Sequence, residues 1–268
     1  MKKTLCIILA IVICAALVVS CAAKEQASDS DWAGIEGKGK MVIGYTVYDP
    51  MNYFDEDGTF IGFDTEYATA VCEKLGVEPD FVEIDWSTKE VELSAGNIDT
   101  IWNGLTVTEE RRENMDFTNS YMENKQVVVI KADNSGKFKS TADLTGGTVA
   151  AEAGSTGEDT IVENEDLSQA TFVGVTKQTD ALLEVKAGTA DAAVIDYTTA
   201  DAMVGEGTDY SDLMIMPGSE LSIEEYAVGC RVGSDLTEKI NEATAELVKD
   251  GTMEKIAEKY GLEAILIK

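Results

Sequence analysis

The sequence contains no histidine among its 268 residues. This absence excludes Ser-His-Asp and Cys-His nucleophile arrangements, as well as every metal site built on imidazole. Any acid–base chemistry would therefore fall to carboxylates, lysine, tyrosine or cysteine. We expect no metal site and no cofactor.

Basic residues are also scarce: 21 lysines and arginines stand against 50 acidic residues, which gives a formal net charge of −29. Such a surface repels phosphate groups over most of its area, so we expect no nucleic-acid partner. It repels anionic membrane surfaces too, so any membrane attachment needs an anchor other than charge.

The five cysteines do not form a metal or disulfide framework. Cys6 and Cys14 lie in the N-terminal apolar run, and Cys21 follows its end. Cys72 and Cys230 each stand among apolar neighbours, where a cysteine packs as a small hydrophobic residue. We expect both to be buried free thiols, and the sequence leaves a disulfide between them open.

The chain starts with a basic tripeptide, Met1-Lys2-Lys3, and an apolar run over residues 5–19. That run is shorter than the roughly 20 residues of a membrane span, and no positive cluster follows it, so it matches a secretory signal. We expect residues 1–20 to be a signal peptide that takes no part in the fold.

Residues 18–22, Val-Val-Ser-Cys-Ala, resemble the processing site of bacterial lipoproteins, with Val18 where that family prefers leucine. The resemblance implies that Cys21 becomes the first residue and carries the lipid anchor, including palmitate. Residues 21–39 would then form a flexible tether between the lipid and the fold. Ordinary cleavage near Ala22 and a retained helix are the alternatives.

Strand and helix patterns alternate along the rest of the chain. Residues 41–46, 81–84 and 98–102 are typical of strands, and residues 63–75 form an amphipathic helical pattern that ends at Gly76. A second alternating set follows in the later half of the chain. The alternation predicts an α/β fold with parallel sheets, and the extended segments between the two sets predict two lobes.

The stretch over residues 101–111 is typical of a strand end, a polar loop and the first turn of a helix. Thr108 is a suitable N-cap for that helix. An arginine beside a threonine hydroxyl suits a carboxylate, because the planar guanidinium makes two parallel charge-assisted hydrogen bonds. The alternative is that Thr108 only caps the helix and that Arg111 is a solvated surface charge.

Two further strand ends carry candidate groups. Gly154-Ser155-Thr156-Gly157 follows a strand and opens a helix, so its N–H groups and the helix dipole favour a small anion. Asp196 ends another strand and can accept an ammonium group. Because ligands of open α/β sheets bind beyond the carboxyl ends of the strands, these groups can meet at one site. Together they describe the head group of an α-amino acid, with carboxylate grips at Thr106, Arg111 and Thr156 and an ammonium acceptor at Asp196.

These ordered motifs resemble the polar amino-acid solute-binding proteins of bacterial ABC importers, family 3. The resemblance runs from about residue 40 to the C-terminus. It is carried by Gly62-Phe63-Asp64, residues 98–121, Gly154-Ser155-Thr156 and residues 190–196.

The resemblance implies a two-lobe clamp of the periplasmic-binding-protein type, in which each lobe is a mostly parallel sheet flanked by helices. Lobe 1 would comprise residues 40–122 and 223–268, and lobe 2 residues 123–222. A monomer of this kind captures a polar L-amino acid outside the cell membrane and delivers it to the permease of an ABC importer. The lipid on Cys21 would hold it at the membrane, and no catalytic residues are expected.

The resemblance also implies the ligand contacts. They are the carboxylate-binding Thr106 and Arg111, the turn of Ser155 with the amide donor Thr156, the ammonium-binding Asp196, backbone contacts from Asn103 and Gly104, and the aromatic side chains of Tyr48 and Trp86. For Trp86, a place in the core is the competing interpretation.

Two positions depart from the family pattern. Tyr45 stands where some members that bind basic amino acids have an acid, and Glu152 stands where some glutamine-binding members have lysine. If Glu152 faces the cleft, it disfavours an acidic ligand and suits an amide or a cation. It could equally point to solvent.

Other functions stay open at this point. A dehydratase of arogenate-type substrates on the same scaffold could use Glu152 or Asp196 as a general acid. An amino-acid sensor domain is a third possibility. The sequence does not decide whether the bound amino acid is an amide, a basic residue or cystine.

Overall fold

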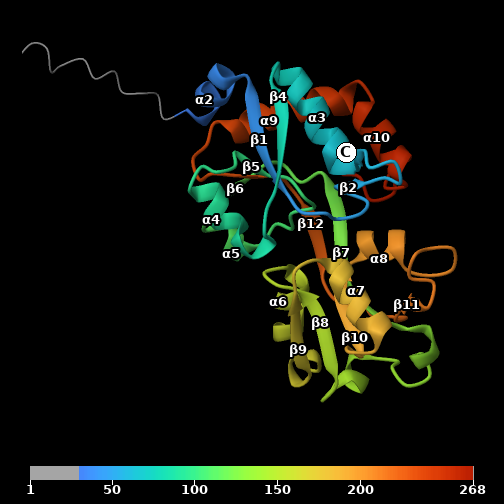
Figure 1. Ribbon diagram of the computed structural model, residues 1–268. Helices are drawn as coiled ribbons and strands as arrows, with labels where there is room; N and C mark the ends of the chain where they lie inside the picture. The colour runs from blue at the N-terminus through green and yellow to red at the C-terminus, as the bar shows by residue number, and fades with distance from the viewer. Residues whose placement is uncertain (1–29, 268) are drawn as a thin grey trace, which may run out of the picture.

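The structure is a computed structural model that describes residues 30–267 of the chain (Figure 1). The expected signal peptide, Cys21 and the first part of the expected tether lie outside the described residues. Within the described part, no helix combines the length and the apolar character needed to cross a membrane.

The segment just before the first strand forms helix α2 (Asp31–Lys38), so the expected flexible tether is wrong for these residues. Ile35 buries its side chain in the core of the first lobe, and Asp31 pairs with Arg231 at 2.9 Å. Two glycines within the helix, at positions 34 and 37, lower its helix propensity. The sequence therefore shows no clear helical period here, and contacts with distant residues stabilise the helix.

The first lobe, the upper one in Figure 1, is built on a sheet with the strand order β4-β1-β5-β13-β6. Strands β4, β1 and β5 are parallel, whereas β13 is antiparallel to both of its neighbours. The bounds are β1 (Lys40–Tyr45), β4 (Glu78–Glu83), β5 (Thr100–Ile101), β6 (Asp116–Phe117) and β13 (Gly229–Cys230), with a separate hairpin of β2 (Tyr53–Phe54) and β3 (Phe60–Ile61).

Helices of the first lobe come from both ends of the chain. α3 packs with α9 and α10, so the cyan and red ribbons of Figure 1 lie together. The helices are α3 (Phe63–Leu75), η2 (Trp86–Thr88), α4 (Lys89–Ser94), α5 (Glu109–Arg112), α9 (Leu236–Lys249) and α10 (Thr252–Tyr260).

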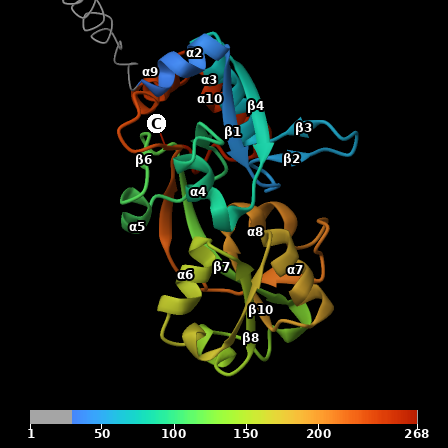
Figure 2. The same cartoon turned by 60° about the vertical axis from the view of Figure 1, so that its left-hand side comes forward.

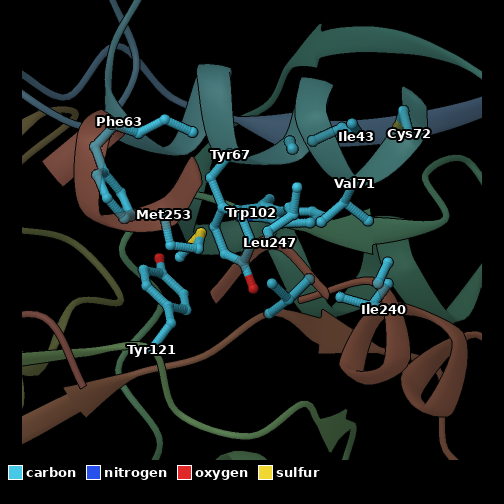
Figure 3. Close-up of a cluster of buried hydrophobic side chains, with 14 of the residues drawn as sticks. Ile43, Phe63, Tyr67, Val71, Cys72, Trp102, Tyr121, Ile240, Leu247 and Met253 are labelled. Atoms are coloured by element: carbon cyan, nitrogen blue, oxygen red, sulfur yellow. The ribbon is translucent and has the colours of Figure 1, made fainter. Parts of the chain in front are cut away.

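The core of the first lobe is aromatic and aliphatic (Figure 3). Tyr67 meets Trp102 edge to face, with ring centroids 4.8 Å apart, and both side chains are fully buried. Cys72 belongs to the same core, and Cys230 is buried in it as well. Both cysteines are free, which confirms the expectation of buried thiols.

The second lobe is built on a sheet with the order β11-β7-β10-β8-β9. β10, β8 and β9 are parallel, and β7 is antiparallel to β10 and β11. The strands are β7 (Met122–Lys131), β8 (Thr148–Glu152), β9 (Thr171–Val175), β10 (Ala192–Asp196) and β11 (Leu213–Ile215). The helices are η3 (Ala132–Asn134), η4 (Thr141–Leu144), α6 (Thr156–Glu163), η5 (Leu167–Gln169), α7 (Gln178–Ala187) and α8 (Tyr197–Met203).

Two antiparallel strands, β7 and β12 (Ile223–Tyr226), run side by side between the lobes, as Figures 1 and 2 show. Their register pairs Met122 with Tyr226 and Lys125 with Ile223. The lobe limits expected from the sequence fall at these strands and stay a prediction. The two-lobe α/β fold is confirmed. Each sheet is mixed, because β7 and β13, which the chain forms after it passes from one lobe to the other, are antiparallel to their neighbours.

Candidate functional site

A cavity between the two lobes collects every residue that the sequence predicts for the ligand site. The lining side chains lie close together and leave little free space between them. The lining residues are Tyr48, Trp86, Asn103, Gly104, Thr106, Arg111, Glu152, Ser155, Thr156, Gln178 and Asp196. Gln178 is the member of this set that is not predicted from sequence. The structure thus brings the ten predicted residues together, and their contact with a ligand stays a prediction.

Arg111 is buried, so its interpretation as a solvated surface charge is wrong. Thr108 does cap helix α5, because its hydroxyl accepts a 3.1 Å hydrogen bond from the Arg111 N–H. The guanidinium donates to the Thr106 carbonyl at 2.8 Å and to the Gly154 carbonyl in the second lobe at 3.3 Å. Burial lowers the pKa of Arg111, but guanidinium remains charged in proteins and carries five N–H donors. Donors are therefore left for a carboxylate.

The strand-end loop at Asn103 and Gly104 is fixed by the side chains around it. Asn103 donates to the Thr46 hydroxyl at 2.7 Å and accepts from the Thr46 N–H at 3.0 Å. Gly104 has a φ of 55°, and a Cβ there would lie 2.5 Å from the Tyr48 ring, so the position requires glycine. The Gly104 N–H donates to the Asp64 carboxylate at 2.6 Å, which removes this N–H from the donors available to a ligand.

Tyr48 and Trp86 line the cavity and also belong to the packed interior. The Tyr48 hydroxyl lies 2.6 Å from the hydroxyls of Thr198 and Tyr226, which holds its ring in place. The Lys89 Nζ lies 4.8 Å from the centroid of the Trp86 ring. Trp86 is therefore a cavity wall and a core residue at once.

The turn before helix α6 contributes the second-lobe side of the expected carboxylate grip. The Ser155 hydroxyl caps the helix by accepting from the Glu158 N–H at 3.3 Å. The Thr156 hydroxyl accepts a 3.0 Å hydrogen bond from the Gln126 amide. The first N–H groups of a helix and its dipole favour an anion, so this turn and Arg111 can act on the same carboxylate.

Asp196 is buried at the end of β10 and accepts hydrogen bonds from three amide side chains. Asn124 and Gln126 each donate to Oδ1 at 2.6 Å, and Gln178 donates to Oδ2. Burial and the charge of Glu224 raise the pKa of Asp196 to about 6, while the three amides oppose that rise. The three amide donors favour the ionised form, which is the form that accepts an ammonium group. A carboxylate offers about four acceptor positions, which leaves room for an ammonium group.

Glu152 ends strand β8 and lines the cavity, so the interpretation that it points to solvent is wrong. Its side chain is 5% exposed, and its Oε1 has no hydrogen-bond partner. Burial and the charge of Asp196 raise the pKa of Glu152 to about 8, while Lys89 lowers it. Tyr45 packs instead against Phe60, with ring centroids 4.5 Å apart, and is not among the lining residues.

Gln178 and the polar side chains behind the cavity are not among the residues predicted from sequence. Gln178 opens α7 after β9, so it stands at a strand end like the residues that were found. Asn124 and Gln126 alternate with exposed or half-buried positions along β7, and this period of two could have revealed their buried face. Glu224 offered no comparable signal, because it is one of many acids in the sequence.

Residues 41–263 match the family described as bacterial extracellular solute-binding proteins, family 3. The chain is 29% identical over 261 residues to the arginine-binding extracellular protein ArtP of Bacillus subtilis, covering 97% of this chain and 98% of that protein. A solved ABC uptake transporter substrate-binding protein of Streptococcus pneumoniae with bound histidine superposes with a TM-score of 0.80 at 35% identity, covering 90% of this chain and 100% of that one. The ancestral amino acid-binding protein AncCDT-1, described as a precursor of cyclohexadienyl dehydratase, gives a TM-score of 0.77 at 30% identity and covers 86% and 99% of the two chains. The chain therefore belongs to the bacterial extracellular solute-binding proteins, family 3.

Proposed function

We propose that the chain captures a polar L-amino acid between its two lobes and delivers it to the permease of an ABC importer. The observation that carries this proposal is that one cavity holds a cationic and an anionic side chain, one for each charged group of an amino acid. Arg111 suits a carboxylate, and Asp196 suits an ammonium group. A free α-amino acid carries both groups on one carbon, so it can meet both partners at once.

Each lobe supplies part of the proposed contacts, so binding couples to closure of the clamp. Arg111 and Thr106 come from the first lobe, and Thr156 and Asp196 from the second. A ligand that touches both lobes gains contacts only in the closed form and shifts the population toward it. The crossing strands β7 and β12 are the natural hinge, and the permease would recognise the closed form.

We further propose that the protein is a lipid-anchored monomer outside the cytoplasmic membrane. The basic start, the apolar run and Cys21 support this location, and the negative surface offers no electrostatic attachment to anionic lipid. Cells labelled with palmitate would carry the label on this protein, and the Cys21→Ala variant would lack it and leave the membrane fraction. Equal labelling of both forms would contradict the anchor.

The proposed function includes binding without chemical conversion. A dehydratase is the second candidate, because Glu152 in the cavity has a pKa raised to about 8 and can donate a proton to a leaving group. The head-group partners, however, account for a plain amino acid. Formation of product from arogenate by the purified protein would favour the enzyme, and stoichiometric binding without product would favour the binding protein.

A thermal-shift screen of the purified full chain in mild detergent tests the proposal. The screen covers the common amino acids and cystine. A ligand at about 100 times its dissociation constant should add about 2.7 kcal/mol to the free energy of unfolding. The Arg111→Ala variant should lose the shift. The absence of a shift with every amino acid would count against the proposed function.

A further inference from the structure

Glu152 is a cavity-lining residue whose side chain lacks a partner. Among the described residues that line the cavity, it alone carries a buried side-chain oxygen without a hydrogen bond, the Oε1 atom. With 5% of its surface exposed, the side chain has little access to water. A buried carboxyl group without a partner is destabilising, because it has lost its hydration and gained nothing in return. Such a group is expected to find its partner in the bound ligand.

Lys89 is a cation that acts on Glu152, but its hydrogen bonds go elsewhere. Its Nζ donates to the Gly154 carbonyl at 2.9 Å and to the Trp86 carbonyl at 3.3 Å. No hydrogen bond from Lys89 reaches the Oε1 of Glu152. The lysine charge therefore acts through space and does not satisfy the carboxyl group.

The buried charges around the cavity leave a negative excess when Glu152 is ionised. Three carboxyl groups, those of Glu152, Asp196 and Glu224, face two cations, Arg111 and Lys89, and all five side chains are buried. A zwitterionic head group brings one charge of each sign and leaves this excess unchanged. Either a proton on Glu152 or a positive charge on the ligand side chain can cancel it. The net charge of −29 on the whole chain attracts protons and other cations alike, so the surroundings of Glu152 decide between the two.

The surroundings of Glu152 also suit a positively charged side chain. β8 and β10 are neighbouring parallel strands, so Glu152 lies at the same sheet edge as the ammonium acceptor Asp196. The Trp86 ring in the cavity wall can attract a cation to its face. Gln178 uses both ends of its amide on Asp196, donating to the carboxylate and accepting from the N–H at 3.0 Å. These bonds fix the Gln178 amide against Asp196, and one amide hydrogen and one carbonyl lone pair stay available.

We propose that Glu152 determines specificity by pairing with a positive charge on the ligand side chain, so that the ligand is an amino acid that ends in a guanidinium or an ammonium group. The inference rests on the proposed function, because it takes the head group to lie between Arg111 and Asp196. A guanidinium fits a carboxylate with two parallel hydrogen bonds. An acidic side chain would meet a like charge instead.

Matched ligand pairs test the inference on the full chain in mild detergent, with affinities from isothermal titration calorimetry. L-Arginine and L-citrulline have nearly the same shape and differ by one charge, and L-lysine and L-glutamine extend the comparison. The wild type should bind the charged member about 30-fold or more tightly, the effect of losing one partner of a desolvated charge pair. The Glu152→Gln variant should reduce that ratio toward one while still binding amino acids.

Glu165→Gln is the matched control, because it removes one negative charge from an exposed position of the same lobe. This control should keep the wild-type ratio. Wild-type protein that binds citrulline or glutamine as tightly as arginine or lysine would overturn the inference and leave the proposed function intact. A ratio unchanged in Glu152→Gln would do the same. The failure of every amino acid to bind would overturn both.

Discussion

The carboxylate of Glu224 accepts a 2.9 Å hydrogen bond from the hydroxyl of Thr106. The same oxygen accepts 3.1 Å bonds from the amides of Asn124 and Gln126 and lies 3.4 Å from the Thr156 hydroxyl. One residue of crossing strand β12 therefore holds the threonines of both lobes. Because a hydroxyl has one proton, Thr106 offers a ligand its oxygen lone pairs rather than its O–H. Thr106 thus suits the ammonium end of an amino acid better than the carboxylate expected from sequence.

Replacing Glu224 by glutamine should weaken ligand binding and protein stability together. A neutral amide would replace the charged acceptor on which the hydroxyl and amide donors now converge. Hydrogen bonds to charged groups contribute about 1.5–3 kcal/mol, so we expect a loss of about tenfold or more in affinity. Calorimetry with the best ligand and urea unfolding of the unliganded chain measure the two effects.

Glu225→Gln is the control for this change. Glu225 is the next residue of the same strand, is exposed, and carries the same charge. Because successive side chains of a strand point to opposite faces, the control leaves the cavity untouched. Equal losses in the two variants would show that net charge, and not the contact with Thr106, is responsible.

Arg111→Ala should cost about 3–5 kcal/mol of ligand binding, the range for breaking a buried ion pair. The guanidinium also bonds to the carbonyls of Thr106 and Gly154, so the unliganded protein should lose some stability as well. Arg112→Ala removes the same charge from an exposed neighbour and should leave affinity within about twofold. An affinity of Arg111→Ala equal to that of the wild type would exclude this cavity as the ligand site.

Residues that stand at strand ends could be predicted from sequence, because a strand followed by a cap and a helix is a local pattern. Arg111 and Thr156 illustrate this: each belongs to the first turn or the end of a short helix whose capping residue is visible in the sequence. Their shared cavity follows from the rule that ligands bind beyond the carboxyl ends of strands.

Residues whose environment depends on partners that are distant in the sequence could not be predicted in the same way. Glu224 meets Thr106 across 118 positions of sequence, and no local pattern specifies that pair. The burial of Arg111 and the orientation of Glu152 likewise depend on how the two lobes approach each other. Helix α2 could not be predicted either, because its two glycines weaken the local helical signal. Tertiary contacts such as the ion pair of Asp31 with Arg231 stabilise it.

Lys89→Met should shift the clamp toward an open form and weaken ligand binding. The Lys89 Nζ joins the first lobe to the Gly154 carbonyl of the second at 2.9 Å, and the side chain is buried. A smaller population of the binding-competent form lowers the apparent affinity in proportion. Small-angle scattering should give a larger radius of gyration for the unliganded variant, and saturating ligand should restore the wild-type value.

Lys177→Met tests whether a contact between the lobes must be buried to keep the clamp closed. Lys177 also links the lobes, through a 2.8 Å ion pair with Glu83, but both side chains are partly exposed. Exposed pairs contribute about 0–1 kcal/mol, so this variant should behave almost like the wild type. A larger opening in Lys177→Met than in Lys89→Met would contradict the role given to the buried contact.

Glu152 should make the free energy of unfolding depend on pH. Burial and the charges of Asp196, Asp180 and Asp85 together raise its pKa from 4.5 to about 8, while Lys89 opposes the rise. Below pH 4.5 the carboxyl is protonated in both states, so the cost of a buried negative charge is absent and the free energy of unfolding is highest with respect to this group. Between pH 4.5 and 8 the unfolded chain releases a proton that the folded chain keeps. The free energy of unfolding should therefore fall as pH rises, by up to about 1.4 kcal/mol per pH unit.

The free energy of unfolding of Glu152→Gln is subtracted from that of the wild type at each pH. The difference separates the effect of Glu152 from that of Asp196, whose pKa is also raised. Urea unfolding of both proteins from pH 4 to pH 9 should give a difference that falls with pH and levels off above about pH 8. Glu165→Gln, an exposed change of the same charge, should give a difference that is nearly flat. A Glu152 difference that is flat, or that rises with pH, would mean that the carboxyl is already ionised in the folded protein. The negative excess in the cavity would then be present before any ligand arrives, and a cationic side chain would bind without releasing a proton.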